Sequence, residues 1–160
     1  MTGLLQWATF VTALGCGLAA GVFFAFSAFI MAALDRLPPA RAVAAMQSVN
    51  TRAVTPAFMT ALFGTALACA ALAARAAVTW GEPGAGWILA GSLLYLTGAV
   101  AVTIVISVPL NDTLAAVRPD TAEAAARWRG YRRRWTAWNH VRAAAALGGA
   151  GLLTAALVLT

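Results

Sequence analysis

The side chains of this chain that could do chemistry are three asparagines, one histidine and one arginine. Asn50, Asn111 and Asn139 are the only asparagines among 160 residues, and His140 is the only histidine. Arg142 follows at the start of an apolar run without further charge. An imidazole can act as a general base near neutral pH, and amide or guanidinium groups can donate hydrogen bonds to an oxyanion. Such chemistry requires that these residues share a pocket. Whether they do depends on the structural elements that carry them.

Long uncharged stretches dominate the chain and indicate a membrane protein. Hydrophobic residues make up 62% and charged residues 10%, whereas about a quarter of a soluble domain is charged. About 20 apolar residues are needed to cross the hydrocarbon core. Four continuous stretches meet this length: residues 5–34, 54–79, 86–109 and 139–160. Because these runs do not alternate with polar residues, they favour helices over a barrel. The sequence therefore predicts an all-α, four-transmembrane-helix bundle that forms one domain over residues 1–160.

The arginines predict the orientation of this bundle. All eleven basic residues are arginine, and ten of them lie in the first and third connections, residues 35–52 and 110–142. The positive-inside rule then places both connections in the cytoplasm and both termini outside, as in a multi-pass protein of the bacterial inner membrane. The net charge of +6 indicates contact with anionic lipid. Nucleic acid is excluded as a partner because the arginines flank membrane spans.

Each cytoplasmic connection is expected to contain a short interfacial helix. Pro38 and Pro39 should stop the first span, and "PARAVAAMQSVN" should then form a helix along the surface. Pro109 should kink or close the third span. A second helix should begin at Asp120, with Glu123 completing a capping box. Its aromatic residues recur at helical spacing, so this helix should run into the fourth span.

Small residues in the spans predict close helix packing. Gly17 and Gly21 are four residues apart, a spacing that lets two helix backbones approach. We expect them to pack within the chain, with "LGGAG" of the fourth span as a candidate facing surface. A homo-oligomer through this surface is the less favoured alternative. Cys16 and Cys69 both fall inside spans and are interpreted as small packing residues rather than a disulfide or a metal pair.

The polar residues converge on the cytoplasmic ends of the predicted spans. Asn50 precedes the second span, Asn111 follows the third and Asn139 starts the fourth. Taken singly, the asparagines could be helix caps, Arg142 could extend to lipid headgroups and His140 could be half-exposed. Their gathering on one side favours a polar pocket, because polar groups at membrane depth are costly and often functional. The other residues expected to line it are Gln47, Ser27, Phe24, Trp135 and Trp138.

A metal site is only weakly supported by the sequence. Zinc, copper and non-haem iron usually take two or three histidines, and this chain has one. His140 is the only candidate ligand if a metal is bound. Methionine thioethers could supplement it, but methionine in a span is far more often a packing residue. The cofactor is therefore left open.

Five segments resemble those of a known family, and the resemblance spans nearly the whole chain. They are "GVFFAFSAFIMAALDRLP", "AMQSVN", "PAFM", "VPLNDTL" and "WTAWNHVR", in this order. The chain resembles the anthrone oxygenase-like family of small four-helix integral membrane proteins, and "PLN" and "WNHVR" are the most specific parts. One departure is Ala32, where family members often have proline. This difference would move a kink rather than abolish a site.

The resemblance implies that O2 oxidises the activated CH2 of a lipophilic aromatic molecule, such as an anthrone, to a carbonyl. The carbanion of such a CH2 is an aromatic enolate, which can react with O2 without a metal, so no cofactor beyond O2 is required. The implied base is His140, and the implied donors to the enolate oxygen are Asn139, Asn111 and Asn50. The implied substrate contacts are Arg142 on a phenolate, with Trp138, Trp135, Phe24, Ser27 and Gln47 around the rings.

Two other functions remain open from the sequence. A non-catalytic binder or carrier of small molecules would use the same pocket without chemistry, and a structural subunit would serve a partner in a membrane complex. Oxygen consumption with an anthrone indicates the oxygenase, ligand binding without turnover indicates the binder, and stable co-purification with another protein indicates the subunit.

Overall fold

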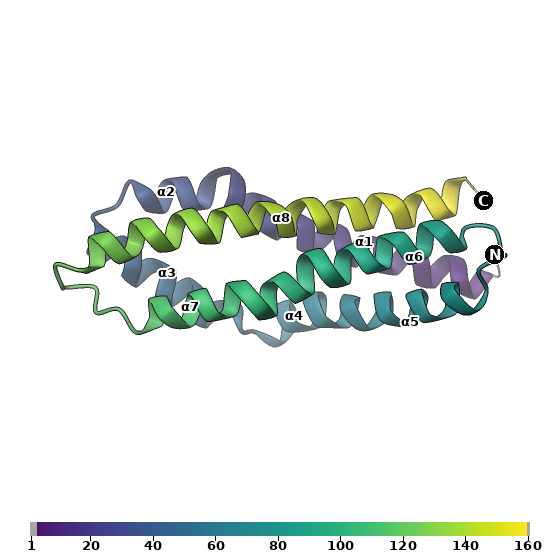
Figure 1. Cartoon of the computed structure of the whole chain (residues 1–160), viewed down its shortest axis with the longest axis horizontal. Helices are drawn as coiled ribbons and strands as arrows, with labels where there is room; N and C mark the ends of the chain where they lie inside the picture. Colours follow the sequence, from purple (N-terminus) through teal and green to yellow (C-terminus); the bar gives the residue numbers. More distant parts are fainter. Residues whose placement is uncertain (1–2, 160) are drawn as a thin grey trace.

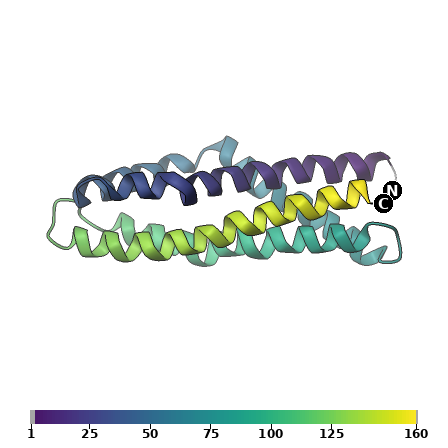
Figure 2. The same cartoon turned by 90° about the horizontal axis from the view of Figure 1, so that it is seen from above.

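The described residues form four long, apolar helical rods. These rods lie side by side along one axis and form an elongated bundle (Figure 1, Figure 2). A computed structural model describes residues 3–159 of the chain. The start of α1 and the end of α8 lie at the same end of the bundle (Figure 1). No strand occurs within the described residues. The predicted all-α class is therefore confirmed.

Each rod combines α-helical and π-helical turns, except the fourth. The first contains α1 (Gly3–Ala25), η1 (Phe26–Ile30) and α2 (Met31–Asp35). The second contains α4 (Pro56–Met59), η2 (Thr60–Gly64) and α5 (Thr65–Val78). The third contains α6 (Ala85–Leu94), η3 (Tyr95–Ala101), η4 (Thr103–Ser107) and α7 (Val108–Ala115). The fourth is α8 (Ala124–Val158), and α3 (Pro39–Ala53) connects the first two rods.

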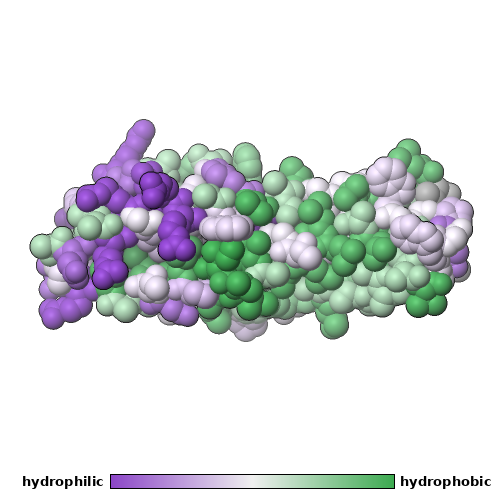
Figure 3. Space-filling view, viewed as in Figure 1, coloured by the Kyte–Doolittle hydropathy of each residue, from purple (hydrophilic) through white to green (hydrophobic). Residues whose placement is uncertain are grey.

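All four rods are long and apolar enough to cross a membrane, so the four predicted spans are confirmed and the chain is an integral multi-pass membrane protein. At about 1.5 Å per residue, the 35 residues of α8 extend about 52 Å. This exceeds the hydrocarbon core of about 30 Å. Figure 3 shows where the excess lies, since hydrophilic residues cover the end opposite the termini. We call this region, formed by α2, α3, α7, residues 116–123 and the start of α8, the arginine-rich end.

The helix expected from Asp120 begins later, and the predicted capping box is wrong. The structure starts α8 at Ala124, with Glu123 at the cap position and no side-chain capping bond. Asp120 instead lies in a turn, 3.6 Å from the guanidinium of Arg118. The expected continuity is correct, because α8 runs unbroken from this end through the membrane.

Proline ends one rod and is tolerated inside another. The first rod ends at Asp35, and Pro39 starts α3, as expected. The third rod does not close at Pro109 but continues to Ala115. The π-helical turn η4 precedes this proline, and such turns change the hydrogen-bond register locally. The helix therefore passes the missing amide donor without ending.

Aromatic residues on one face of α8 form the core of the arginine-rich end. Trp128, Tyr131 and Trp135 are buried against Val43 and Met46 of α3. The helix α3 thus packs against α2, α7 and α8 instead of presenting both faces to a membrane surface. The aromatic spacing that predicts a helix marks its buried face.

The glycines pack differently from the expectation. Gly91 on α6 and Gly149 on α8 approach so closely that a Cβ on either would lie 3.0 Å from the other's carbonyl oxygen. The "LGGAG" segment therefore packs against the third rod. Gly17 and Gly21 have no such neighbour within 4 Å. The expected close approach of another helix is therefore absent at both glycines, which line an open groove between α1 and α8.

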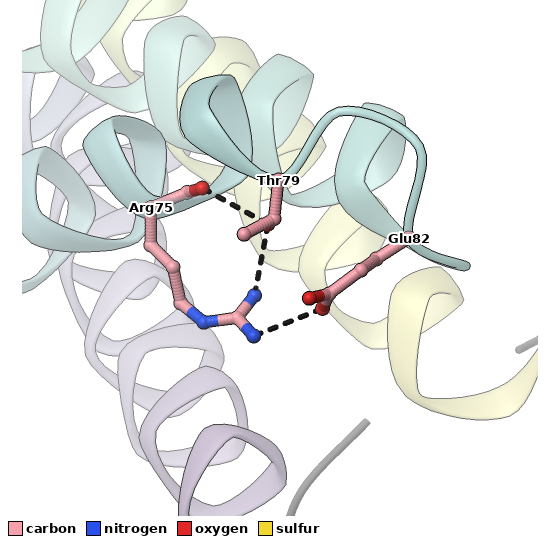
Figure 4. A network of polar contacts seen from close by, with 3 residues as sticks. All are labelled: Arg75, Thr79 and Glu82. Atoms are coloured by element: carbon pink, nitrogen blue, oxygen red, sulfur yellow. Dashed lines mark hydrogen bonds and ion pairs between the residues drawn. The ribbon is translucent and has the colours of Figure 1, made fainter.

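At the end near the termini, a small polar network closes the connection between α5 and α6. The Arg75 guanidinium donates to the Glu82 carboxylate at 2.9 Å and to the Thr79 hydroxyl at 3.1 Å (Figure 4). The turn then reaches Gly84, whose φ of 85° lies in the left-handed region that favours glycine. Arg75, the arginine near the termini, is therefore neutralised by an ion pair.

Cys16 and Cys69 meet in the core of the membrane-spanning part. Their sulfur atoms lie 3.9 Å apart, and both residues are fully buried free thiols. They pack among the apolar residues of α1, α5 and α6, in agreement with the packing role expected of them.

The close packing of the third and fourth rods yields a stability prediction. A Cβ on Gly98 would collide with the Cβ of Ala145, whereas Gly151 has open space around it. Both Gly→Ala changes raise helix propensity by about 1 kcal/mol. Overpacking at Gly98→Ala should outweigh this gain and lower the free energy of unfolding by about 1–3 kcal/mol. Thermal unfolding in detergent should show a lower Tm for Gly98→Ala and an unchanged or higher Tm for Gly151→Ala. Equal values would contradict the packing.

Candidate functional site

A cavity of about 190 Å³ lies between the four rods, where the arginine-rich end meets the membrane-spanning part. Three π-helical turns contribute to its wall, through Phe26 of η1, Leu62 of η2 and Thr103 of η4. Such turns occur frequently at functional sites, because they displace side chains from regular helical positions. Its aromatic lining consists of Phe23, Phe26, Phe58, Phe63 and Trp135. Its polar lining consists of Asn50, Thr103, Ser107, Asn111 and Arg142.

Arg142 places a buried positive charge in this cavity. Only 5% of the residue is exposed. Its guanidinium donates to the Asn139 amide oxygen and, at 3.2 Å, to the Thr103 hydroxyl. The guanidinium carbon also lies 4.4 Å from the centre of the Phe23 ring and 5.1 Å from that of Trp135. None of the ion pairs among residues 3–159 involves this arginine, so its charge is available to a ligand.

Asn139 fixes the position of that guanidinium. The residue is fully buried inside α8, and its amide nitrogen donates to the Phe23 carbonyl at 2.6 Å and to the Ser27 hydroxyl at 2.7 Å. Its oxygen accepts from Arg142 at 2.6 Å. Asn139 is thus an internal link between the first and fourth rods, and not a helix cap. Ser27 reaches the site through this bond.

Asn111 is oriented by two aromatic donors of α8. Its amide oxygen accepts from the Tyr131 hydroxyl at 2.9 Å and from the Trp135 indole at 3.0 Å. Because the oxygen is occupied, its NH2 group is left to face other partners. Asn50 lies near the same tyrosine and lines the same cavity. Asn50 and Asn111 thus line the cavity with Arg142, and Asn139 reaches it through its bond to that arginine. Their roles in a functional site stay predictions.

The unbonded polar atoms around the cavity are donors. The Nε of Arg142 and the Nδ2 of Asn50 are buried and have no hydrogen-bond partner within residues 3–159. Buried polar groups are nearly always paired, so an unpaired one requires an explanation. A ligand that presents acceptor oxygens would satisfy both. The cavity is therefore suited to an oxyanion or a carbonyl oxygen on an otherwise apolar molecule.

His140 does not join this cavity. Its exposed side chain lines an open groove of about 480 Å³ between α1 and α8, together with Phe24 and Gly21. Successive helix residues differ by about 100°, so the two residues between inward-facing Asn139 and Arg142, His140 and Val141, point outward. Phe24 is 64% exposed and Trp138 38%, and neither lines the cavity. The structure separates these three residues from the buried arginine.

Gln47 has a different task from the expected substrate contact. Its amide nitrogen donates to the carbonyls of Leu114 and Val117, both at 2.9 Å. The Leu114 carbonyl lies in the last turn of α7 and also accepts from the Val117 amide at 3.0 Å, whereas the Val117 carbonyl lies just beyond the helix. The glutamine thus ties α3 to the end of α7 and holds Asn50 and Asn111 together.

Several cavity residues were not among those predicted from the sequence. Phe23 stacks on the arginine, and Thr103 and Ser107 bring hydroxyls into the wall. The signal for Thr103 and Ser107 is their polarity within an otherwise apolar span. Within the described residues, no group of three or more His, Cys, Asp or Glu side chains gathers where it could hold a metal ion.

Comparison with known families adds to this geometry. The model of a family described as anthrone oxygenase matches residues 55–152, more than half of the chain. The chain belongs to the anthrone oxygenase family. The match includes Asn111, Trp135 and Arg142, and ends before the last turns of α8. No curated protein and no solved structure matches the chain.

The bonds of Asn139 lead to a second stability prediction. Asn139→Leu removes all three hydrogen bonds and deprives the buried guanidinium of its Asn139 partner, so the free energy of unfolding should fall by about 3 kcal/mol or more. Ser27→Ala removes a single acceptor and should cost about 1 kcal/mol. Thr154→Ala is the control, because its hydroxyl donates to the Ala150 carbonyl on an exposed part of α8. Thermal unfolding in detergent should rank the variants in this order. An Asn139→Leu protein as stable as Ser27→Ala would contradict the link.

Proposed function

We propose that this member of the anthrone oxygenase family oxidises the activated CH2 of a lipophilic aromatic molecule with O2, inside the cavity at Arg142. The observation that supports this most directly is the buried guanidinium without a carboxylate partner, faced by aromatic rings. A positive charge in a poorly solvated site stabilises a developing anion far more than it would in water. The anion of the proposed reaction is an enolate, whose negative charge resides largely on the oxygen atom that is bonded to the ring.

The proposed reaction uses the cavity residues as follows. Loss of a proton from the CH2 leaves an electron pair that is delocalised onto the ring oxygen, where Arg142 and the Asn111 amide can donate hydrogen bonds. The carbanion carbon then reduces O2 and forms a hydroperoxide. Elimination of water from the hydroperoxide gives the ketone, so that CH2 and O2 become C=O and H2O. The protein stabilises charge and excludes water, while the substrate itself supplies the electrons.

The size and the mouth of the cavity fit an aromatic molecule that arrives from lipid. An apolar cavity of about 150 Å³ accommodates benzene, and this cavity measures about 190 Å³. Its edge includes the apolar side chains of Val54, Phe63 and Val108, which are 70%, 41% and 46% exposed. A fused ring system can therefore place its reactive part inside while the remainder contacts these side chains.

Replacement of the guanidinium tests this proposal. Arg142→Met should lower the oxygen consumption of the purified protein with anthrone by about 100-fold or more, because the donor to the enolate is lost. The variant should still fold, since an apolar residue removes the desolvation cost of a buried charge. Arg142→Lys retains the charge without the planar arrangement of donors. Its oxygen consumption should therefore lie between those of the wild type and Arg142→Met. Wild-type turnover by the Met variant would exclude the proposed role of Arg142.

His140 provides a matched comparison on the same helix. Because its side chain opens onto the groove and not the cavity, His140→Ala should retain oxygen consumption with anthrone within about twofold, at any pH where the wild type is active. This expectation departs from the base implied by family resemblance. A loss of about 100-fold would instead restore histidine as the general base.

Binding without turnover would indicate the alternative of a non-catalytic carrier. Equilibrium dialysis with anthraquinone measures binding independently of chemistry, because the quinone has no CH2 to oxidise. The carrier would be supported over the oxygenase by two results together. The wild type would bind the quinone more tightly than the Arg142 variants do, and it would consume oxygen with anthrone no faster than protein-free micelles.

A further inference from the structure

The proposed reaction begins with loss of a proton, yet the cavity contains neither a histidine nor a carboxylate. Its polar lining consists of amide, hydroxyl and guanidinium groups, which are poor proton acceptors at neutral pH. The single histidine lies in the groove on the outer side of α1 and α8. The proton must therefore reach a carboxylate beyond the cavity wall or leave with bulk water.

Three of the five acidic residues are engaged in ion pairs, and two of these, Asp35 and Glu82, lie outside the turn before α8. Asp35 accepts from the Trp128 indole at 3.2 Å and pairs with Arg132 at 3.0 Å. Glu82 pairs with Arg75 in the connection between α5 and α6, at the end opposite the arginine-rich end. Neither residue lines the cavity.

Two further carboxylates belong to the turn before α8. Asp120 lies beside Arg118 with both side chains largely exposed. Glu123 lines a shallow depression with Arg118 and Arg127 that shares no residue with the cavity. These groups have cationic neighbours and no passage to the substrate.

The fifth carboxylate, Asp112, lies beside the cavity, in a depression that adjoins it. It lines an open depression of about 410 Å³ that shares Asn50, Val54, Val108 and Asn111 with the cavity wall. Asp112 follows Asn111 directly on α7, so the amide donor and the carboxylate occupy neighbouring positions on one turn. The side chain is exposed, and no ion pair within residues 3–159 involves it. Asp112 is also the only ionisable residue that lines this depression.

We propose that Asp112 is the proton acceptor for the molecule bound in the cavity, and that the depression it lines is the route of the proton. The inference rests on the proposed function for the identity of the CH2 donor. Arg142 and Asp112 then flank the reacting atoms with opposite charges. The guanidinium stabilises the enolate oxygen, and the carboxylate receives the proton directly or through water in the open depression.

The proton balance closes with a single carboxylate. Asp112 takes the first proton of the CH2, and the electron pair of that C–H bond stays on the substrate as the enolate. After addition of O2, the carboxylic acid returns the proton to the peroxide anion. The carboxylate then removes the second proton as the O–O bond breaks and the carbonyl forms. The departing hydroxide takes up this proton and becomes water, so Asp112 ends as it began.

Exchange of the substrate CH2 with deuterium isolates this step from the chemistry of O2. Purified protein in detergent micelles is mixed with anthrone in deuterated buffer without O2, and deuterium uptake at the CH2 is followed by NMR. The wild type should accelerate the exchange over protein-free micelles. Asp112→Asn should reduce the protein-dependent rate by about 100-fold or more. Asp112→Glu should restore most of it, because the carboxylate is retained.

Controls separate a chemical role from a structural one. Asp120→Asn removes the same charge from the same end of the protein, outside the depression, and should exchange as the wild type does. Anthraquinone binding and Tm should be unchanged in Asp112→Asn, because the side chain has no structural partner.

The outcomes judge the two proposals separately. Either of two results overturns the role of Asp112. In the first, Asp112→Asn catalyses deuterium exchange at the wild-type rate; in the second, the wild type itself exchanges no faster than protein-free micelles. If oxygen consumption with anthrone persists in either case, the proposed function stands without this proton acceptor. If exchange depends on Asp112 but no oxygen is consumed, the proton acceptor stands and the oxygenase is excluded.

Discussion

The arrangement of the site depends on one constraint, the burial of the Arg142 guanidinium at membrane depth without an anionic partner. A charge in that position is expensive, and neighbouring groups from three rods compensate for it. The amide of Asn139 and the hydroxyl of Thr103 accept its hydrogen bonds, and two aromatic rings face its charge. The same amide holds the first rod through the Phe23 carbonyl. A packing link and an anion-binding group are therefore parts of one network.

The fold was predictable from hydropathy and charge because membrane spans obey strong physical limits on length and polarity. The four spans and the continuation of the tryptophan-rich helix into the last span follow from such limits. The onset of α8 at Ala124 does not, since Asp120 can serve an ion pair as well as a cap. The outer placement of Gly17 and Gly21 was also unpredictable, because small residues indicate close packing without naming the partner.

For the site, the sequence predicted which asparagines gather but not which neighbours accompany them. The outward direction of His140 was predictable once Asn139 and Arg142 were assigned to the interior, because successive residues of a helix point about 100° apart. The contributions of Phe23 and Thr103 depend on how η1 and η4 displace the helix surface. Such π-helical turns have no clear sequence pattern, so the positions of these two side chains could not be predicted from the sequence.

The unbroken course of α8 also bears on how this family can vary. Trp135, Asn139 and Arg142 share one line along the helix, while His140 lies on another. Insertion of one residue upstream would rotate every later side chain by about 100° and carry the guanidinium from the interior into lipid. Length changes among relatives should therefore fall in the turns at 79–84 and 116–123. We expect α8 to keep the same length among relatives even where its amino-acid sequence changes.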